Sequence, residues 1–232
     1  MSKPTQLPEP ITLKQSIGPS FILLGLALGS GELIMWPYLV SQYGLGIIWG
    51  GLIGITFQYF LNTEIMRYTL AWGESVFVGW RKMSRAIPYW FVFSTVIPWA
   101  LPGFVLTSAS MLNHVFPQLD IKYTAITLVL LTGLIISSGK TLYKTMEQVQ
   151  KTLLLIGVPF VSILTIYMAR GSDWSSLLQG LVGIGDGYAF LPKGIAIGAF
   201  LGAFAYSGGG GNLNLSQSYY IKEKGMGMGK YG

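Results

Sequence analysis

The chain has 232 residues, of which 51% are apolar and only 10% are charged. A soluble domain carries roughly a quarter of charged residues, so this composition excludes an ordinary soluble protein and predicts a multi-pass membrane protein. The net charge is +6, but the basic residues lie in short segments between apolar runs, which argues against nucleic-acid binding.

Six apolar segments approach the length that a bilayer-spanning helix needs, which is about 20 residues. They are residues 17–40, 46–70, 89–112, 123–138, 152–169 and 193–220. Residues 1–16 form a polar tail without the layout of a signal peptide. The sequence therefore predicts an all-α transmembrane domain over residues 17–221, followed by an end segment, residues 222–232.

Lysine and arginine residues gather on one side of the predicted membrane. With the N-terminus inside, the outer segments hold only Lys122, Arg170 and Lys193. The inner side holds Lys3, Lys14, Arg67, Arg81, Lys82, Arg85, Lys140, Lys144, Lys151, Lys222, Lys224 and Lys230. Because basic residues favour the cytoplasmic side, we expect a bacterial-type inner membrane protein with both the tail and the end segment in the cytoplasm.

Two predicted spans are interrupted by glycine-rich polar stretches. The first contains Gly29-Ser30-Gly31-Glu32, and the sixth contains Ser207 and four glycines before Asn212. Glycine weakens a helix because it has the most backbone freedom to lose. Unwound backbone at membrane depth is tolerated only where protein buries it or water reaches it, and an acid there indicates a functional site. Paired interruptions predict a transporter's binding site near the middle of the membrane.

The two interruptions together offer a set of oxygen ligands. The candidates are the carboxylate of Glu32, the hydroxyl of Ser30, the amide oxygens of Asn212 and Asn214, and backbone carbonyls at Gly29, Ser30, Gly31, Tyr206 and Ser207. Carbonyls freed from a helix need new partners, and an all-oxygen set suits hard cations such as Mg²⁺, Mn²⁺ or Ca²⁺.

Each of these residues also has a structural interpretation. Glu32 could be an acid bonded to backbone amides at a helix N-terminus, where the helix dipole favours it. The glycine run could be a hinge, and Asn212 could cap the second half of the sixth helix. Because Glu32 and Trp36 are four residues apart, we expect them to share a helix face.

No pattern typical of an enzyme is present. The chain has no cysteine, no Ser/His/Asp arrangement and no HExxH motif, and its single histidine, His114, is predicted in an outer loop. We therefore expect neither catalysis nor a bound cofactor. Glu64 and Arg67 are predicted to pair near the inner interface, and Glu147 is predicted in a solvated inner loop.

Small and aromatic residues in the spans predict how the helices pack and where they end. Gly-x-x-x-Gly spacings at residues 46–50, 50–54 and 198–202 predict close helix approach. Tryptophans near predicted span ends, including Trp36, are expected at the membrane interfaces.

Several motifs resemble those of the Nramp family of divalent metal transporters. They are Gly18-Pro19-Ser20-Phe21, Gln42-Tyr43-Gly44, Arg67 with Gly73, Gly139 with Glu147, and Asn212-Leu213 followed by Leu215. Gly29-Ser30-Gly31-Glu32 falls where the family has Asp-Pro-Gly-Asn. The resemblance covers essentially the whole chain and is that of a divergent member.

This resemblance implies a LeuT-like fold of two inverted five-helix repeats, with the first and sixth helices broken at a shared site. The chain would supply the first repeat and the sixth helix, and the missing C-terminal half of the transporter would be its structural partner. The resemblance further implies transport of a divalent metal ion across the lipid bilayer by alternating access.

Departures from the family motifs shift the expected substrate. The family's metal-binding Asp falls at Gly29, its Met at Gly209 and its His at Gly211, and acids linked to proton movement fall near Leu101 and Phe104. Losing thioether and imidazole ligands favours harder ions such as Mg²⁺ or Mn²⁺. An organic-solute symporter on the same fold and a non-transporting scaffold stay open as alternatives, as do the coupling ion and the oligomeric state.

Overall fold

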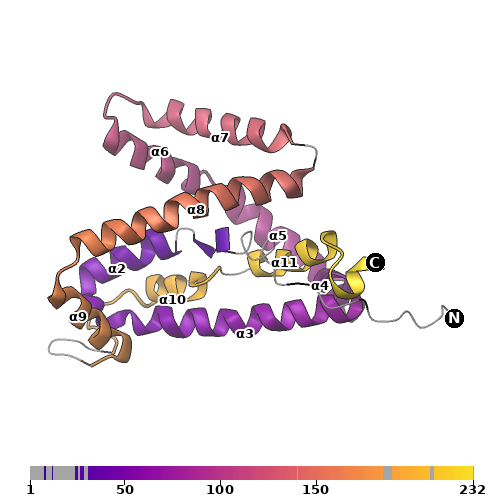
Figure 1. The fold of residues 1–232 in the computed structure, drawn as a ribbon, viewed down its shortest axis with the longest axis horizontal. Helices are drawn as coiled ribbons and strands as arrows, with labels where there is room; N and C mark the ends of the chain where they lie inside the picture. The colour runs from indigo at the N-terminus through magenta and orange to yellow at the C-terminus, as the bar shows by residue number, and fades with distance from the viewer. Residues whose placement is uncertain are drawn as a thin grey trace. The chain divides into compact units, whose positions relative to one another are not determined.

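The structure is a computed structural model, and it describes residues 8, 12, 24, 25, 27, 28, 31–139, 141–184, 190–209 and 212–231. Within these residues it is helical and contains no strand (Figure 1). Three stretches are long and apolar enough to cross a membrane: Leu45–Trp72, Ile87–Val115 and Lys144–Met168. The predicted all-α class is therefore confirmed, and the helices are consistent with a membrane protein.

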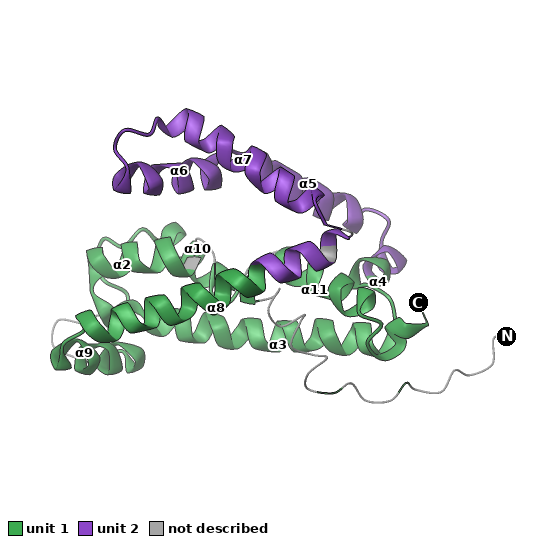
Figure 2. Cartoon of the chain, turned by 45° about the horizontal axis from the view of Figure 1, so that its top comes forward, with its two compact units in different colours: residues 1–79, 150–232 green, residues 80–149 purple. Residues whose placement is uncertain are grey.

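The helices follow one another in this order. They are η1 (Gly31–Met35), α2 (Trp36–Tyr43), η2 (Leu45–Ile47), α3 (Trp49–Trp72), α4 (Val76–Met83), α5 (Ile87–Ala100), α6 (Gly103–Val115), α7 (Ile121–Ser137), α8 (Leu142–Met168), α9 (Gly171–Val182), α10 (Ile197–Tyr206), α11 (Asn212–Glu223) and η3 (Gly227–Lys230). The chain divides into two compact units (Figure 2). Unit 1 comprises Met1–Gly79 and Gln150–Gly232, and unit 2 comprises Trp80–Val149.

The core of unit 1 forms where α2 and η2 meet α10. Its buried side chains are Trp36, Leu39, Ile47, Phe200 and Ala203. The rings of Trp36 and Phe200 meet edge to face with their centroids 6.0 Å apart, a favoured aromatic geometry. Trp49, at the start of α3, stacks on Phe190 at 3.9 Å, and its indole N–H donates to the carbonyl of that residue at 3.0 Å.

Glycines allow α3 to approach α10 closely. A Cβ added to Gly54 would lie 2.7 Å from the carbonyl oxygen of Phe204, and one added to Gly50 would lie 2.7 Å from the ring of Phe200. The close packing predicted from the spacing at residues 50–54 is therefore confirmed. The spacing at residues 198–202 does not mark an equally close contact at Gly198, because a Cβ on Gly198 would meet no described atom within 4 Å.

Unit 2 contains α5, α6 and α7, and its third predicted span is interrupted. α5 ends at Ala100, and Leu101 is extended with ψ 137° before α6 begins at Gly103. Pro102 explains the break, because a proline pushes the preceding residue out of the helical region. His114 lies in the last turn of α6, so its predicted place in a loop was wrong.

α8 is longer than the predicted fifth span. It begins at Leu142, so Glu147, Lys144 and Lys151 belong to a helix, and the prediction of an inner loop there was wrong. Polar and charged side chains at the start of an amphipathic helix can extend it beyond the apolar run, which is the only part that hydropathy detects.

Candidate functional site

The second interruption lies between α10 and α11, where glycine conformations end the helix. α10 stops at Tyr206, and Ser207 is extended with ψ 115°. Gly208 and Gly209 have φ of 80° and 87°, in the left-handed region that residues with a Cβ rarely adopt. The break predicted from the glycine run is therefore present, while positions 210 and 211 lie outside the described residues.

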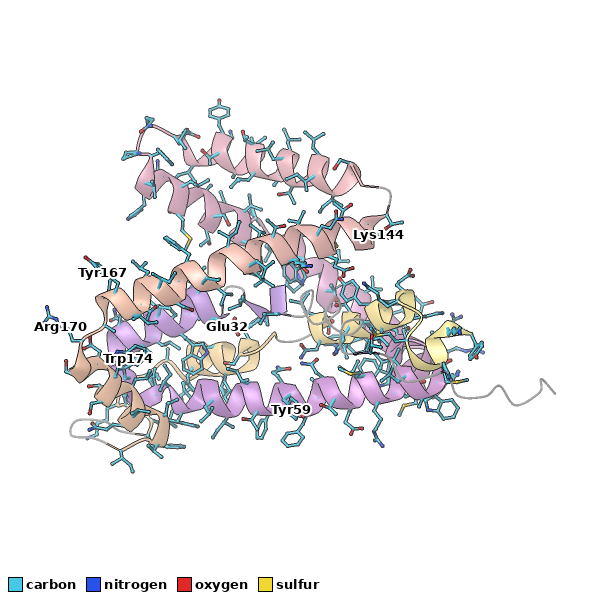
Figure 3. All side chains as sticks on the ribbon, in the orientation of Figure 1. Glu32, Tyr59, Lys144, Tyr167, Arg170 and Trp174 are labelled. Atoms are coloured by element: carbon cyan, nitrogen blue, oxygen red, sulfur yellow. The ribbon has the colours of Figure 1, made fainter. Side chains whose placement is uncertain are left out.

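The first interruption leads into a π-helical turn. The turn is η1, and Glu32 is its acidic residue. Such turns are rare and frequently mark functional sites. Glu32 is half-buried within unit 1, whereas Tyr59 on α3 points outward (Figure 3). Gly29 and Ser30, two of the predicted ligands, lie outside the described residues.

Two side chains, one in the first interruption and one a turn after it, bond to the second interruption. Glu32 Oε1 accepts a hydrogen bond from the backbone N–H of Gly208 at 2.6 Å. One helical turn later, the indole N–H of Trp36 donates to the hydroxyl of Ser207 at 2.7 Å. The two side chains therefore reach adjacent residues of the break, as their four-residue spacing predicts. A hydrogen bond to a carboxylate is roughly twice as strong as a neutral one.

The bond to Gly208 is the kind of contact that the structural interpretation of Glu32 predicts. It is also compatible with ion binding, because a carboxylate has two oxygens with about four lone-pair sites in all. The contact therefore places Glu32 at the junction of the two interruptions, and its role as a ligand stays a prediction.

The other predicted ligands that the structure describes lie at or next to the same junction. The hydroxyl of Ser207 also donates to the Ala203 carbonyl at 2.9 Å, and the residue is 1% exposed. The Tyr206 carbonyl accepts from the N–H of Gly209 at 3.3 Å. Asn212 is the first residue of α11 and is half-buried. Ligation by these three residues stays a prediction.

Gln58 on α3 is a polar residue of this junction that the sequence analysis missed. Its Nε2 donates to the Ala205 carbonyl at 3.1 Å, and its Oε1 accepts from the amide of Asn214. It thereby links α3 to both sides of the second interruption. The available signal was a glutamine within an apolar span, because an amide at membrane depth requires partners.

Trp36 is a buried core residue, and its place at a membrane interface stays a prediction. It is 7% exposed and belongs to the core of unit 1. A Cβ added to Gly50 or Gly51 would lie within 3.4 Å of its indole, so these two glycines make room for the ring. Its N–H finds a buried partner in Ser207, which removes the need for a wet interface.

The chemistry available at the junction is that of oxygen donors with one acid. In the part of the chain that the structure describes, no three His, Cys, Asp or Glu side chains come together. A cation bound here would therefore combine the Glu32 carboxylate with carbonyl and amide oxygens. Hard cations accept such ligands, and Mg²⁺ in particular keeps several waters beside one or two carboxylates.

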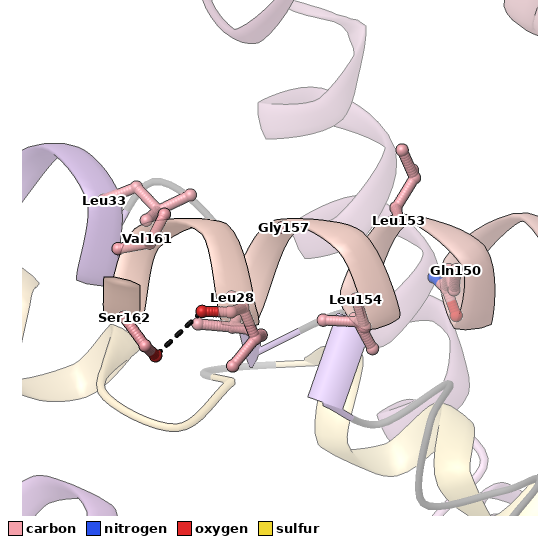
Figure 4. Close-up of a pocket in the computed structure, with 10 residues that line it drawn as sticks. Leu28, Leu33, Gln150, Leu153, Leu154, Gly157, Val161 and Ser162 are labelled. Atoms are coloured by element: carbon pink, nitrogen blue, oxygen red, sulfur yellow. Dashed lines mark hydrogen bonds between the residues drawn. The ribbon is translucent and has the colours of Figure 1, made fainter. Parts of the chain in front are cut away.

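A separate cavity of about 350 Å³ lies in unit 1 against α8 (Figure 4). Apart from glycines, Gln150 and Ser162, its lining is aliphatic: Leu28, Leu33, Leu153, Leu154, Val158 and Val161. The hydroxyl of Ser162 donates to the Val158 carbonyl at 2.8 Å. Because no lining residue is charged, this cavity is poorly suited to a metal ion.

Comparisons of the chain with protein-family models, with curated proteins and with solved structures gave no match. The resemblance to the Nramp family therefore consists of sequence motifs alone.

Proposed function

We propose that the protein transports hard divalent cations, Mg²⁺ or Mn²⁺, across a membrane and that Glu32 belongs to the cation site. The observation that carries this proposal is the 2.6 Å hydrogen bond between Glu32 Oε1 and the N–H of Gly208. It joins the only acid of the first interruption to the glycine break of the second. Substrate sites of secondary transporters lie where two discontinuous helices meet in this way.

The same hydrogen bond suggests how a cation would influence the fold. A cation that enters the junction competes with the Gly208 N–H for the carboxylate. Exchanging one partner for the other changes how firmly η1 is tied to the segment between α10 and α11. In the LeuT-like fold that we propose, this coupling would link cation binding to the rocking of one helix bundle against the other.

The geometry favours a cation over an organic acid or amino acid. A substrate carboxylate would need backbone N–H donors at the interrupted helices. Glu32 already accepts the N–H of Gly208, and its negative charge would repel a second carboxylate.

Uptake of Mg²⁺ and Mn²⁺ into proteoliposomes by the chain together with its proposed C-terminal half tests the proposal, with Glu32→Gln as the variant. Replacing the charged ligand is expected to lower uptake by at least about tenfold, the equivalent of one charge-assisted interaction. Glu64→Gln is the matched control, because Glu64 pairs with Arg67 on an exposed surface of α3. This control is expected to retain uptake.

Each other outcome contradicts a specific part of the proposal. Equal uptake by the wild-type protein and Glu32→Gln would remove Glu32 from the site. Clear preference for Fe²⁺ or Cd²⁺ would overturn the hard-ion assignment. Movement of organic solutes without Mg²⁺ or Mn²⁺ uptake would indicate a symporter, and movement of neither would indicate a scaffold.

A further inference from the structure

The buried face of α3 passes from α10 to α11 along its length. Gln58 bonds to both, through the carbonyl of Ala205 and the amide of Asn214. Near the end of α3, a Cβ on Gly73 would come within 2.5 Å of the carbonyl oxygen of Met228, in η3 just after α11. α3 and α11 therefore run side by side in the same direction.

In this register, helical spacing predicts that Asn62 lies opposite Gln217. Asn62 lies one turn beyond Gln58, about 6 Å along α3, and Gln217 lies about 4.5 Å beyond Asn214 along α11. Residues three or four apart share a helix face. Asn62 and Gln217 are buried, with 9% and 3% of their surfaces exposed. We call Gln58, Asn62, Asn214 and Gln217 the carboxamide cluster.

Three oxygens of the carboxamide cluster are buried acceptors. Asn62 Oδ1, Asn214 Oδ1 and Gln217 Oε1 are shielded from solvent, and no donor in the described part of the chain bonds to them. Each unsatisfied buried acceptor costs about 1–3 kcal/mol, and hydrocarbon offers no water as a substitute. Exchanging the oxygen and nitrogen of the Asn214 amide does not satisfy the acceptor. The amide nitrogen already donates to Gln58 Oε1, and the exchange would place the Asn214 oxygen against the Gln58 oxygen.

The unsatisfied atoms are all neutral acceptors, which identifies the class of ligand. A cation satisfies several acceptors at once. Divalent cations depend on carboxylate charge, whereas neutral carbonyl oxygens replace the hydration shell of alkali ions. Glu64, the acid closest in sequence to Asn62, pairs with Arg67, and its side chain is 61% exposed.

We propose that the carboxamide oxygens of Asn62, Asn214 and Gln217 bind an alkali-metal cation, Na⁺ or K⁺, between α3 and α11. The site borders the second interruption, because a Cβ on Gly209 would lie 3.3 Å from Asn214 Oδ1. It adjoins the junction at Glu32, with which the carboxamide cluster shares Gln58, and its existence does not depend on the transport of divalent ions.

Thermal unfolding of the purified protein in detergent tests this site without any transport assay. The melting temperature is measured in NaCl, KCl and choline chloride at equal ionic strength. A bound cation stabilises the folded state by mass action, so Tm is expected to rise by about 3–6 °C for each tenfold increase of Na⁺ or K⁺ above its Kd. Choline, which is too large for the site, is expected to give no such rise.

Variants at Gln217 connect the stabilisation to the carboxamide cluster. Gln217→Met removes the oxygen at similar volume and is expected to abolish the alkali-dependent rise. Gln217→Glu adds a negative charge, which is expected to tighten cation binding. The increase of Tm is therefore expected to persist and to begin at lower Na⁺ or K⁺ concentrations. Thr69→Val is the matched control on the same buried face, since the Thr69 hydroxyl already donates to the Ile65 carbonyl at 3.0 Å. This control is expected to behave like the wild type.

Two results would overturn the proposal. The first is an identical Tm of the wild-type protein in alkali and choline chloride, which would mean that water alone serves the three oxygens. The second is an unchanged alkali response in Gln217→Met, which would place the cation elsewhere. If Gln217→Met does not fold, an unaltered response in Gln217→Glu has the same meaning, because added charge at the site must change cation affinity.

Discussion

Gly208 combines a backbone conformation and a hydrogen bond on which the second interruption depends. Its φ of 80° lies in the left-handed region, and its N–H donates to Glu32. A residue with a Cβ meets a steric penalty of roughly 1–2 kcal/mol in this conformation. Glycine at position 208 therefore allows both the end of α10 and the orientation of the N–H toward Glu32.

Replacing Gly208 with alanine is expected to lower stability by about 1–2 kcal/mol. The change should also lower cation uptake, because a relaxed backbone would move the N–H away from Glu32 and so remove the partner that the cation exchanges with during transport. Thermal unfolding in detergent measures the first effect and proteoliposome uptake the second. Gly198→Ala is the control: Gly198 is helical within α10 and a Cβ there would meet no described atom within 4 Å, so this variant is expected to be neutral or more stable. Equal melting temperatures of the two variants would contradict the argument.

Trp36 contributes a buried donor as well as a buried ring. Trp36→Phe keeps the aromatic character but removes the N–H that donates to Ser207. The expected loss is about 1 kcal/mol, the typical net worth of one hydrogen bond. Because the two side chains share that bond, Trp36→Phe combined with Ser207→Ala is expected to cost less than the sum of the single variants. Strict additivity in thermal unfolding would show that the bond contributes nothing.

At the scale of elements, α3 is organised by a stripe of small and amide residues. Gly50 and Gly54 meet α10, and Gln58 bonds to both α10 and α11. Gly73, the residue that caps the C-terminus of α3, meets η3. The glycine part of this stripe was visible in the sequence, because Gly-x-x-x-Gly spacing predicts close approach. The sequence did not show which helix approaches, because spacing defines a face and not its partner.

Gly54→Ala tests the close approach of α3 and α10. The added methyl group would lie 2.7 Å from the Phe204 carbonyl, so the backbones must separate, and the expected loss of stability is about 1–3 kcal/mol. Gly133→Ala in α7 is the control, since a Cβ there would meet no described atom within 4 Å. Thermal unfolding of both variants measures the difference. A Gly54→Ala protein as stable as the control would show that α3 and α10 do not pack tightly.

At the scale of the whole molecule, the distribution of basic residues predicts the topology. Arg85 lies between α4 and α5, and Lys122 lies in the first turn of α7. The positive-inside rule places Arg85 in the cytoplasm and Lys122 outside.

Single cysteines test this topology with little background, because the chain has no cysteine of its own. A membrane-impermeant maleimide applied to intact cells is expected to label Lys122→Cys and to leave Arg85→Cys unlabelled until the membrane is broken. The unmodified protein, which cannot react, is the control. The reverse labelling pattern would invert the proposed orientation.

The membrane-type composition, the helical class and the break at residues 207–209 could be predicted from the amino-acid sequence. These properties are local: apolar length defines a span, and a glycine run ends a helix whatever packs against it. The break at Leu101 was equally local, and Pro102 would have predicted it.

The contacts between groups far apart in the chain depend on how the helices pack. Glu32 and Gly208 are 176 positions apart, and Gln58 and Asn214 are 156 apart. Helical periodicity gives the face on which each side chain lies, but the partner depends on the register and direction in which two helices pack. The burial of Trp36, the junction at Glu32 and the carboxamide cluster follow from that packing, which the sequence analysis could not specify.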